Sequence, residues 1–359
     1  MSKGKTIAIT RFAHIFKLGN DKVVKSISKD GLLPPHDPLM ELSILEKLTK
    51  NESNRNVIQL LDYQENTNYD LVFKYYPLTL KELLLSGYIS IVNPYYNVTA
   101  SSPTENYYRN RFDSNKYAYD FFKQLINGLA YIHSLQIIHR DIKLDNILME
   151  DNGNNNFTLV VTDFGISYDA SDENRGNELI NDKITDVSTS IYKAPELLFS
   201  VRNYTNKVDI WAAFIVLSQL LIDPAMKVKN QKNIPAVVTD GSFSDDDNDG
   251  FREEVGSDIK LLFSIFEKFG IPSAAQWPEV INYGTADTFI GMFGNSGDSK
   301  YFLDKKTPEA EEYMEQIIPG LRNIEGKQQR ETLVQCCIGM ASFESTTRFS
   351  AEQLLEYLN

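Results

Sequence analysis

The sequence predicts an α+β protein of two lobes, a small antiparallel β lobe with one helix followed by a larger, mainly α-helical lobe. Short apolar runs separated by turn residues dominate residues 1–76, a pattern typical of antiparallel strands. From residue 77 onward, apolar residues recur mostly at helical spacing. A length of 359 residues also suits about two domains or lobes. We therefore divide the chain into a first lobe of residues 1–76 and a second lobe of residues 77–359.

The first lobe is predicted to contain five short strands and one helix. Gly19, Asn20 and Asp21 separate the second strand from the third, as expected for a hairpin turn. Apolar residues recur at helical spacing in Pro38–Leu48, and proline is tolerated near the start of a helix. The predicted strands are Thr6–Thr10, Arg11–Lys17, Lys22–Ile27, Val57–Leu61 and Leu71–Tyr75.

The second lobe is predicted to consist mainly of helices, of which Lys207–Ile222 is the most apolar. That run is too short to span a bilayer, which indicates a buried helix. Two polar segments near residues 88–115 and 223–258 are interpreted as inserts, and residues 163–196 as a loop. The other predicted helices are Leu78–Leu85, Tyr117–Ser134, Ile259–Phe269, Ala310–Ile318, Glu331–Met340 and Ser350–Leu358, with short strands in Ile137–Met149 and Phe157–Thr162.

Composition argues against several classes of partner. The 36 basic and 49 acidic residues give a net charge of −13, which disfavours nucleic acid or a membrane as the main partner because both attract basic surfaces. Cys336 and Cys337 are adjacent, so we expect no disulfide framework and a reducing compartment. The first residues contain no long apolar stretch, so we expect no secretory signal. These features predict a cytoplasmic protein, with the nucleus as an additional compartment.

The strongest motif lies in the second lobe, where His139–Asn146 reads HRDIKLDN. A DFG triplet follows at residues 163–165, and an APE triplet stands at residues 194–196. In order and spacing these segments resemble the catalytic loop, the magnesium-binding segment and the end of the activation segment of protein kinases. The resemblance covers nearly the whole chain. It implies the bilobal protein kinase fold, with ATP and Mg²⁺ as cofactors.

Residues of these motifs suit phosphoryl transfer, which needs an aligned nucleophile and neutralised phosphate charge. Asp141 would accept or orient the proton of a substrate hydroxyl, and Lys143 would offset charge on the transferred group. Asn146 and Asp163 offer the oxygen ligands that Mg²⁺ prefers, so both are predicted metal ligands. Thr189 matches the threonine that bonds the catalytic Asp and Lys in serine/threonine kinases, which implies a serine or threonine acceptor.

In the first lobe, the stretch Lys22–Lys25 (KVVK) occupies the place of the kinase V-A-I-K strand. The resemblance implies that Lys25 holds the α- and β-phosphates of ATP. Its ion-pair partner should come from the following helix. Glu41 is the best candidate, ahead of Glu46 and Glu52.

The nucleotide lid departs from the kinase pattern, because none of the three glycines of G-x-G-x-x-G is present. Ala8, Thr10 and Ala13 stand in their places. Glycine lets a backbone approach phosphates closely. We therefore expect a stiffer lid and weaker or differently shaped ATP binding.

The kinase offsets also imply a mostly apolar slot for adenine, a kind of site with few polar anchors. Its predicted members are Ile15, Val23 and Leu148 against the faces of adenine, Phe73 as the gatekeeper, and the backbone groups of Lys74 and Tyr76 at its edge.

Further charged residues are assigned to the scaffold by the resemblance. Asp209 should hold the backbone of the catalytic loop, and Glu196 should pair with Arg348. Arg140 should meet a phosphorylated or acidic group of the activation segment. That segment offers Thr185 and Ser188 as phosphorylation sites and several acids, including Asp182 and Asp186. Thr185 lies near the usual place of an activating phosphate and Asp186 could mimic one, and the sequence does not decide between them.

Five stretches narrow the resemblance: Ile137–Asn146, Asp163–Asp169, Asp186–Glu196, Ile265–Ser273 and Gly291–Gly294. They resemble the monomeric cyclin-dependent-kinase-activating kinases of budding yeasts, a family that also lacks the glycine-rich lid. This resemblance implies a kinase that phosphorylates the activation-loop threonine of cyclin-dependent kinases and promotes cell-cycle progression and cell division. It also implies activity as a monomer, without a cyclin and without prior phosphorylation of its own loop.

Other functions remain open. The missing lid glycines favour a catalytically weak pseudokinase scaffold, and the same motifs would serve a serine/threonine kinase with another protein substrate. A small-molecule kinase is disfavoured, because Lys143, Thr189 and the APE triplet are features of kinases that act on proteins.

Overall fold

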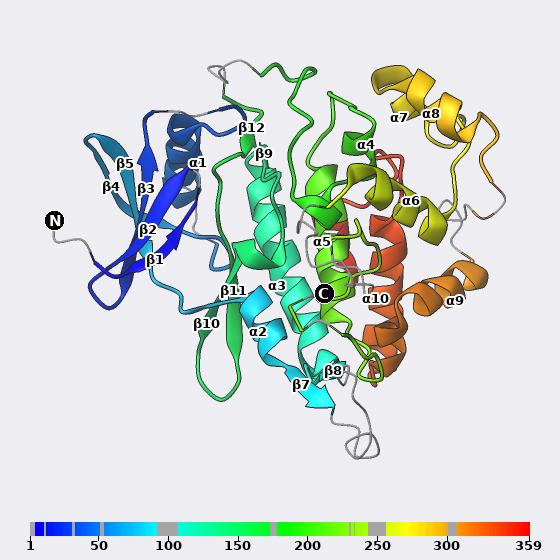
Figure 1. The fold of residues 1–359 in the computed structure, drawn as a ribbon, viewed down its shortest axis with the longest axis horizontal. Coiled ribbons are helices and arrows are strands. Elements are labelled where there is room, and N and C mark those ends of the chain that lie inside the picture. Colours follow the sequence, from blue (N-terminus) through cyan, green and yellow to red (C-terminus); the bar gives the residue numbers. More distant parts are fainter. Residues whose placement is uncertain are drawn as a thin grey trace, which may run out of the picture.

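The computed structural model describes residues 4–10, 12–30, 33–50, 54–91, 107–172, 178–229, 231–232, 234–242, 256–298, 300 and 307–359. The first lobe is a five-stranded antiparallel sheet in the order β1-β2-β3-β5-β4 (Figure 1). Gly19 in the β2–β3 turn has a φ of 71°, which glycine adopts without strain. The strands are β1 (Thr6–Ile9), β2 (Ala13–Leu18), β3 (Lys22–Ser28), β4 (Leu60–Glu65) and β5 (Asn68–Lys74).

The helix of the first lobe, α1 (Pro38–Lys50), begins where the sequence predicts. The side chain of Asp37 caps it by accepting the N–H groups of Leu39 and Met40 at 2.9 and 3.1 Å. Residues spaced three and four apart form its buried face, and α1 contacts both β4 and β12 (Tyr168–Asp169) of the second lobe (Figure 1). The helix therefore lies where it can link the two lobes.

The predicted strand Val57–Leu61 was wrong in its position. Val57 forms only an isolated bridge with Val161, and the N–H of Ile58 donates to the carbonyl of Val161 at 2.9 Å. The strand β4 begins later, at Leu60. Val57 and Ile58 are apolar because they are buried against the second lobe, so a short apolar run here indicated burial rather than sheet pairing.

Seven predicted helices of the second lobe are present, with bounds that differ by up to four residues. They are α2 (Leu80–Ser86), α3 (Ser114–Ser134), α5 (Lys207–Leu220), α6 (Asp258–Phe269), α9 (Pro308–Ile317), α10 (Lys327–Met340) and α11 (Ala351–Leu358). The short helices α4 (Pro195–Leu198), α7 (Pro278–Tyr283) and α8 (Ala286–Phe293) were not predicted, because so few turns show little periodicity. The short strands are β6 (Leu78–Thr79), β9 (Ile137–Ile138), β10 (Ile147–Asp151) and β11 (Phe157–Val161).

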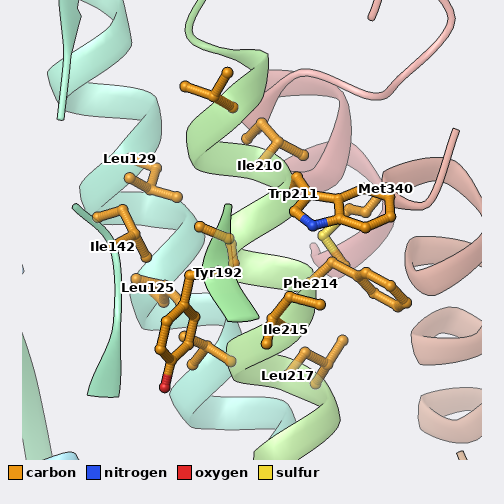
Figure 2. Packing of buried hydrophobic residues seen from close by; sticks show 14 of the residues in the cluster. Leu125, Leu129, Ile142, Tyr192, Ile210, Trp211, Phe214, Ile215, Leu217 and Met340 are labelled. Carbon is orange, nitrogen blue, oxygen red and sulfur yellow. The ribbon is translucent and has the colours of Figure 1, made fainter. Parts of the chain in front are cut away.

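The core of the second lobe is built around α5, which contacts both α3 and α10. Figure 2 shows Trp211 and Phe214 of α5 on the side of Met340, and Leu125 and Leu129 of α3 on the other side. Residues 208–220 of α5 are all buried, which explains why its sequence is apolar all round. None of the helices in the described part of the chain could cross a membrane.

The first insert is not irregular at its ends. Tyr88–Ile91 forms β7 and Tyr107–Asn110 forms β8, and the two strands pair with each other as a hairpin. Residues 92–106 of this insert, and residues 243–255 of the second one, lie outside the described residues. The described part of the second insert contacts the activation segment, because the hydroxyl of Ser190 donates to the buried carboxylate of Asp240.

A buried carboxyl group in the second lobe gives the stability of the fold a pH dependence. Glu279 lies in the first turn of α7 and accepts the hydroxyl and the N–H of Ser345 at 2.7 and 3.1 Å. Burial, together with the negative charge of Glu196, raises the pKa of Glu279 to about 7. The folded protein therefore keeps a proton that the unfolded chain loses near pH 4.5. The contribution of this group to the free energy of unfolding falls as the pH rises from there to about 7.

We expect Glu279→Gln to remove this loss, because glutamine resembles the protonated form. Relative to wild type, the variant should gain about 2 kcal/mol in the free energy of unfolding between pH 5 and pH 8. Thermal melting across that pH range measures the difference, with the exposed Glu356→Gln as control. A difference between variant and wild type that stays constant with pH would contradict the prediction.

Candidate active site

The catalytic loop lies between β9 and β10. Hydrogen bonds to Asp209, in the first turn of α5, hold its backbone in place. Asp209 is buried and accepts the backbone N–H groups of His139 and Arg140, each at 2.8 Å. Its carboxylate also contacts Nε2 of His133 at 2.9 Å. Burial alone would raise the pKa of Asp209, but these partners hold it below its usual value. The role predicted for Asp209 is confirmed, and it fixes the loop that carries the catalytic motif.

The carboxylate of Asp141 is held by three donors. Oδ1 accepts the hydroxyl of Thr189 at 2.7 Å, and Oδ2 accepts Nζ of Lys143 at 2.8 Å and Nδ2 of Asn146 at 2.9 Å. Lys143 also donates to Thr189 at 2.9 Å. The structure thus brings together every residue predicted around the substrate hydroxyl, and it fixes one orientation for Asp141.

A second charged cluster joins the two lobes, with Lys25 and Glu41 from the first lobe and Asp163 from the second. Nζ of Lys25 lies 2.6 Å from Oε1 of Glu41 and 2.7 Å from Oδ1 of Asp163. Burial alone would lower the pKa of Lys25, but the two carboxylates raise it overall. In the same way the pKa of Asp163 lies well below its usual range, because Lys25 outweighs the cost of burial. Lysine and aspartate are both charged here, and the predicted pairing of Lys25 with Glu41 is present.

The DFG glycine packs closely against this cluster. A Cβ built on Gly165 would lie 3.3 Å from Oδ1 of Asp163, 3.4 Å from Oε2 of Glu41 and 3.5 Å from Nζ of Lys25. Asp163 itself has a φ of 69°, an uncommon value for a residue other than glycine and one of the backbone conformations that cluster at functional sites. The segment is therefore built to present this carboxylate.

Both clusters open into one cavity of about 330 Å³ between the lobes. Its lining includes Lys25 and Glu41 of the first lobe and Asp141, Lys143 and Asp163 of the second lobe. Asn146 is buried behind Asp141 and is joined to the DFG segment because its carbonyl accepts the N–H of Thr162 at 3.0 Å. An ATP phosphate chain bound in this cavity would contact the two lobes at once.

Thr10 forms hydrogen bonds within the lid, the turn between β1 and β2. Its hydroxyl oxygen accepts the N–H groups of Phe12 and Ala13 at 3.3 and 3.0 Å. The ring of Phe12 stacks on His36, in the loop before α1, with ring centroids 3.7 Å apart. Backbone donors that a glycine-rich lid would turn toward phosphates are therefore bonded to a side chain of the lid. This geometry agrees with the stiffer lid expected from the missing glycines.

The residues predicted to hold adenine lie mainly on β2, β3, β5 and β10. Val23 pairs with Phe73 across β3 and β5, and Leu148 of β10 faces Thr79 of β6. Lys74 forms an ion pair with Glu150 through its side chain. Burial raises the pKa of Tyr76 to about 12. Of the nucleotide residues predicted from the sequence, Ile15, Lys25 and Glu41 line the cavity, whereas Ala8, Val23, Phe73, Lys74, Tyr76 and Leu148 are not part of its lining.

The acidic partner of Arg140 is Glu178, which the sequence did not single out. The guanidinium donates to both carboxylate oxygens of Glu178, at 2.9 and 2.7 Å. The N–H of Ile184 donates to the same carboxylate at 2.9 Å. Burial alone would raise the pKa of Glu178, but these bonds lower it, so the group is charged. Asp186 is instead almost fully exposed and lies 3.5 Å from Lys193.

Two metal ligands were predicted, and their chemistry suits Mg²⁺. Asp163 supplies a charged carboxylate and Asn146 an amide, both hard oxygen donors. Among the described residues no cluster of three or more His, Cys, Asp or Glu side chains could hold a metal. A set of two protein ligands is what Mg²⁺ uses when waters and substrate phosphates complete its shell. The residues therefore fit the ion.

Comparisons with known proteins agree with this geometry. Residues 17–357 match the protein kinase domain family. The chain is 35% identical, over 97% of its length and 95% of the relative's, to the serine/threonine-protein kinase CAK1 of Saccharomyces cerevisiae. It is 27% identical, over 75% of its length and 62% of the relative's, to cyclin-dependent kinase 7 of Xenopus laevis.

Two solved structures share the fold. One is the CAK complex of Chaetomium thermophilum bound to ATP-gamma-S, with a TM-score of 0.62, 19% identity, and coverage of 99% of this chain and 88% of that one. The other is the yeast RNA Pol II CTD kinase CTDK-1 complex, with a TM-score of 0.59, 20% identity, and coverage of 99% and 91%. The predicted bilobal fold is confirmed. The chain belongs to the protein kinase family, and it is a serine/threonine kinase similar over nearly its whole length to CAK1.

Proposed function

We propose that this kinase phosphorylates the activation-loop threonine of cyclin-dependent kinases and so promotes cell-cycle progression and cell division. The main support is the likeness to CAK1, which extends over 97% of the chain. The intact set of Lys25, Asp141, Asn146 and Asp163 supports catalysis rather than a scaffold role, since each is held by partners that fix its charge or orientation. We place the division between the lobes at residues 76 and 77.

ATP is the proposed phosphoryl donor, bound between the lobes with Mg²⁺. Lys25 would hold the α- and β-phosphates, because Glu41 and Asp163 keep it charged and aimed into the cavity. Asp163 and Asn146 would hold the metal ion, which supplies positive charge to the phosphates when bound. The adenine ring would lie among Ile15, Val23, Phe73 and Leu148, with the backbone of Lys74 and Tyr76 at its edge and Ala8 in the lid above.

Transfer then depends on the cluster around Asp141. A substrate hydroxyl within hydrogen-bond distance of this carboxylate would donate its proton there as the oxygen attacks the γ-phosphorus. The bond between the γ-phosphorus and the bridging oxygen would break, and ADP would leave. Lys143 lies 2.8 Å from the same carboxylate, close enough to offset negative charge on the transferred group. Thr189 belongs to the segment that would bear the substrate, and its bond to Asp141 ties that segment to the base.

We further propose activity as a monomer in the cytoplasm and nucleus, without a cyclin and without phosphorylation of the activation segment. The pair between Arg140 and Glu178 supports the last point. Arg140 lies under the segment, with its guanidinium 4.8 and 5.5 Å from the ring centroids of Tyr168 and Tyr204. A carboxylate of the segment itself, rather than a phosphate, neutralises this buried cation.

The test is transfer of labelled phosphate from Mg-ATP by the purified chain alone. The substrates are an unphosphorylated cyclin-dependent kinase and the same protein with its activation-loop threonine replaced by valine. Label on the first and not on the second is expected. Labelling of a general peptide without labelling of either protein would remove the substrate assignment. Absence of any transfer would instead favour the pseudokinase scaffold, for which the self-bonded lid around Thr10 is the favouring observation.

We expect Glu178→Gln to lower kcat about tenfold, the effect of roughly 1.4 kcal/mol in the barrier. The neutral amide cannot balance Arg140, so the activation segment should lose its fixed position. The control is Asp186→Asn, because the Asp186 side chain is exposed and far less constrained. Phosphatase treatment of the wild type should leave kcat unchanged. Loss of activity in the control but not in Glu178→Gln would contradict this assignment.

A further inference from the structure

The helix α1 carries Glu41, so its position decides whether Lys25 is paired. A helix at the edge of a small lobe needs a contact that holds it against the rest of the molecule. The structure shows such a contact near its C-terminal end, at Lys47. Nζ of Lys47 lies 2.8 and 3.0 Å from the two carboxylate oxygens of Asp169 in β12. It also donates to the carbonyl of Leu135 at 2.8 Å and to the hydroxyl of Ser171 at 2.6 Å.

We propose that Lys47 is a positioning residue that clamps α1 onto the second lobe and keeps Glu41 against Lys25 without a partner protein. This inference rests on the partner-free activity proposed above. It does not depend on which protein is the substrate. Neither Lys47 nor Asp169 touches the phosphate cavity, so both would act through the helix.

The spacing of the contacts explains how one lysine can fix the position of α1. Glu41 and Lys47 are six residues apart, which corresponds to about 9 Å along an α-helix. Their counterparts in the second lobe are Asp163, bridged to Glu41 through Lys25, and Asp169, bonded to Lys47. These two carboxylates are also six residues apart. One end of α1 meets this segment through the Glu41–Lys25–Asp163 bridge, and the other meets it directly through Lys47. The helix is therefore tied to the DFG segment at two points, which fixes its rotation as well as its distance.

The clamp is shielded from water on the side of the second lobe. The side chain of Asp169 is only 5% exposed, and that of Lys47 is 26% exposed. The carboxylate of Asp169 also accepts the N–H and the hydroxyl of Ser171, at 2.9 and 2.7 Å. A buried carboxylate with fixed bonds cannot follow a moving lysine, and removing its cation leaves a costly charge. The Lys47–Asp169 ion pair is therefore a largely buried contact that can hold α1 in place, unlike an exposed surface ion pair.

A second bond supports the same end of the helix, while its outer face is mostly polar. The hydroxyl of Tyr131 in α3 donates to the carbonyl of Leu48 at 2.8 Å. On the outer face, Ser43 is exposed, and Glu46 pairs with Lys50 at 2.9 Å. Leu39 is the exposed apolar residue there. A helix held from inside the molecule does not require an apolar outer face for a partner to cover.

The test compares Lys47→Met, Lys47→Met/Asp169→Asn and Lys47→Arg with wild type. The assay measures transfer from Mg-ATP to a general serine-containing peptide by the purified chain alone. Methionine keeps the length and apolar stem of lysine but removes the charge. The double variant also removes the unpaired buried carboxylate, so it keeps the test valid if Lys47→Met does not fold. Thermal melting identifies the variants that are folded.

We expect kcat of the folded double variant to fall at least about tenfold, because only a fraction of molecules keeps Glu41 in place. The KM for ATP should rise, and the KM for the peptide should stay unchanged. Lys47→Arg should retain most activity, because arginine can still donate to Asp169. The matched control is Lys50→Met, which removes an exposed cation from the same helix and should have no effect.

Two results would overturn the proposal, and they are distinguishable. If the wild type and the double variant were equally active, Lys47 would not position α1, and the proposed function would remain intact. A wild-type chain that is inactive until a partner is added would overturn both the clamp and the partner-free activity.

Discussion

Asp141→Asn is expected to lower kcat by about 10²- to 10⁴-fold, the usual contribution of a positioned general base. Asparagine has nearly the same shape, but its NH₂ group would meet the donors of Lys143, Asn146 or Thr189 that now bond the carboxylate. The variant thus loses the proton acceptor and the geometry of the acceptor together. Steady-state transfer from Mg-ATP to the protein substrate measures the effect.

The same variant should bind ATP almost normally. Lys25, Glu41 and Asp163 form a separate cluster, and none of them bonds to the side chain of Asp141 among the described contacts. We therefore expect a large change in kcat with little change in the KM for ATP. The matched control is Asp145→Asn in the same loop, because Asp145 is half-exposed and pairs with Lys81 at 3.0 Å. Equal losses in both variants would mean that the loop, and not the base, had been disturbed.

The catalytic clusters could be predicted because their chemistry fixes residue types at constant offsets. Asp141, Lys143 and Asn146 lie within one loop, and Asp163 follows the next strand. Their meeting therefore requires only the two-stranded hairpin of β10 and β11. Lys25 and Glu41 lie farther away, but the strand-then-helix order places them on facing elements. This part of the site could therefore be predicted from short sequence offsets and the order of the secondary-structure elements.

The contacts that brace the site could not be predicted in the same way. Glu178 belongs to a polar segment without periodicity, and no pattern distinguishes it from Asp182 or Asp186 before the chain is folded. Lys47 appears in the sequence as an ordinary polar position of an amphipathic helix, although its partner Asp169 is 122 residues away. Charge pairs across such separations depend on the tertiary fold. The misplaced strand at Val57–Leu61 has a related cause, because the burial of Val57 and Ile58 against Val161 is also a contact of the tertiary fold.

The lid shows how a local prediction and a tertiary contact combine. The absence of glycine at Ala8, Thr10 and Ala13 predicted a stiff turn, and the hydroxyl of Thr10 supplies the bonds that stiffen it. The stacking of Phe12 on His36, however, joins this turn to the approach to α1. The lid and the helix that carries Glu41 are therefore coupled at one end, as Lys47 couples that helix to the second lobe at the other.

Of the substitutions proposed here, Arg348→Met is expected to lower the free energy of unfolding most, because it breaks an ion pair with no exposed surface. Nη1 and Nη2 of Arg348 donate to the two oxygens of Glu196 at 2.6 and 2.9 Å, and both side chains are 0% exposed. Arg348 also donates to the carbonyls of Ser342 and Lys207, each at 2.9 Å. Removing one partner of a buried pair costs about 3–5 kcal/mol. That is a large part of the 5–15 kcal/mol that separates most folded and unfolded proteins.

For a chain of this size, such a loss should lower the melting temperature by roughly 5 °C. Glu196→Gln/Arg348→Met should recover part of it, because no buried charge is then left unpaired. The surface control is Lys327→Met, whose partner Glu331 lies 3.7 Å away on an exposed helix face, and it should change stability by less than about 0.5 kcal/mol. If the double variant were as unstable as Arg348→Met, the stability would come from the carbonyl bonds of Arg348 and not from neutralising Glu196. The APE glutamate would then have a smaller structural role than its burial indicates.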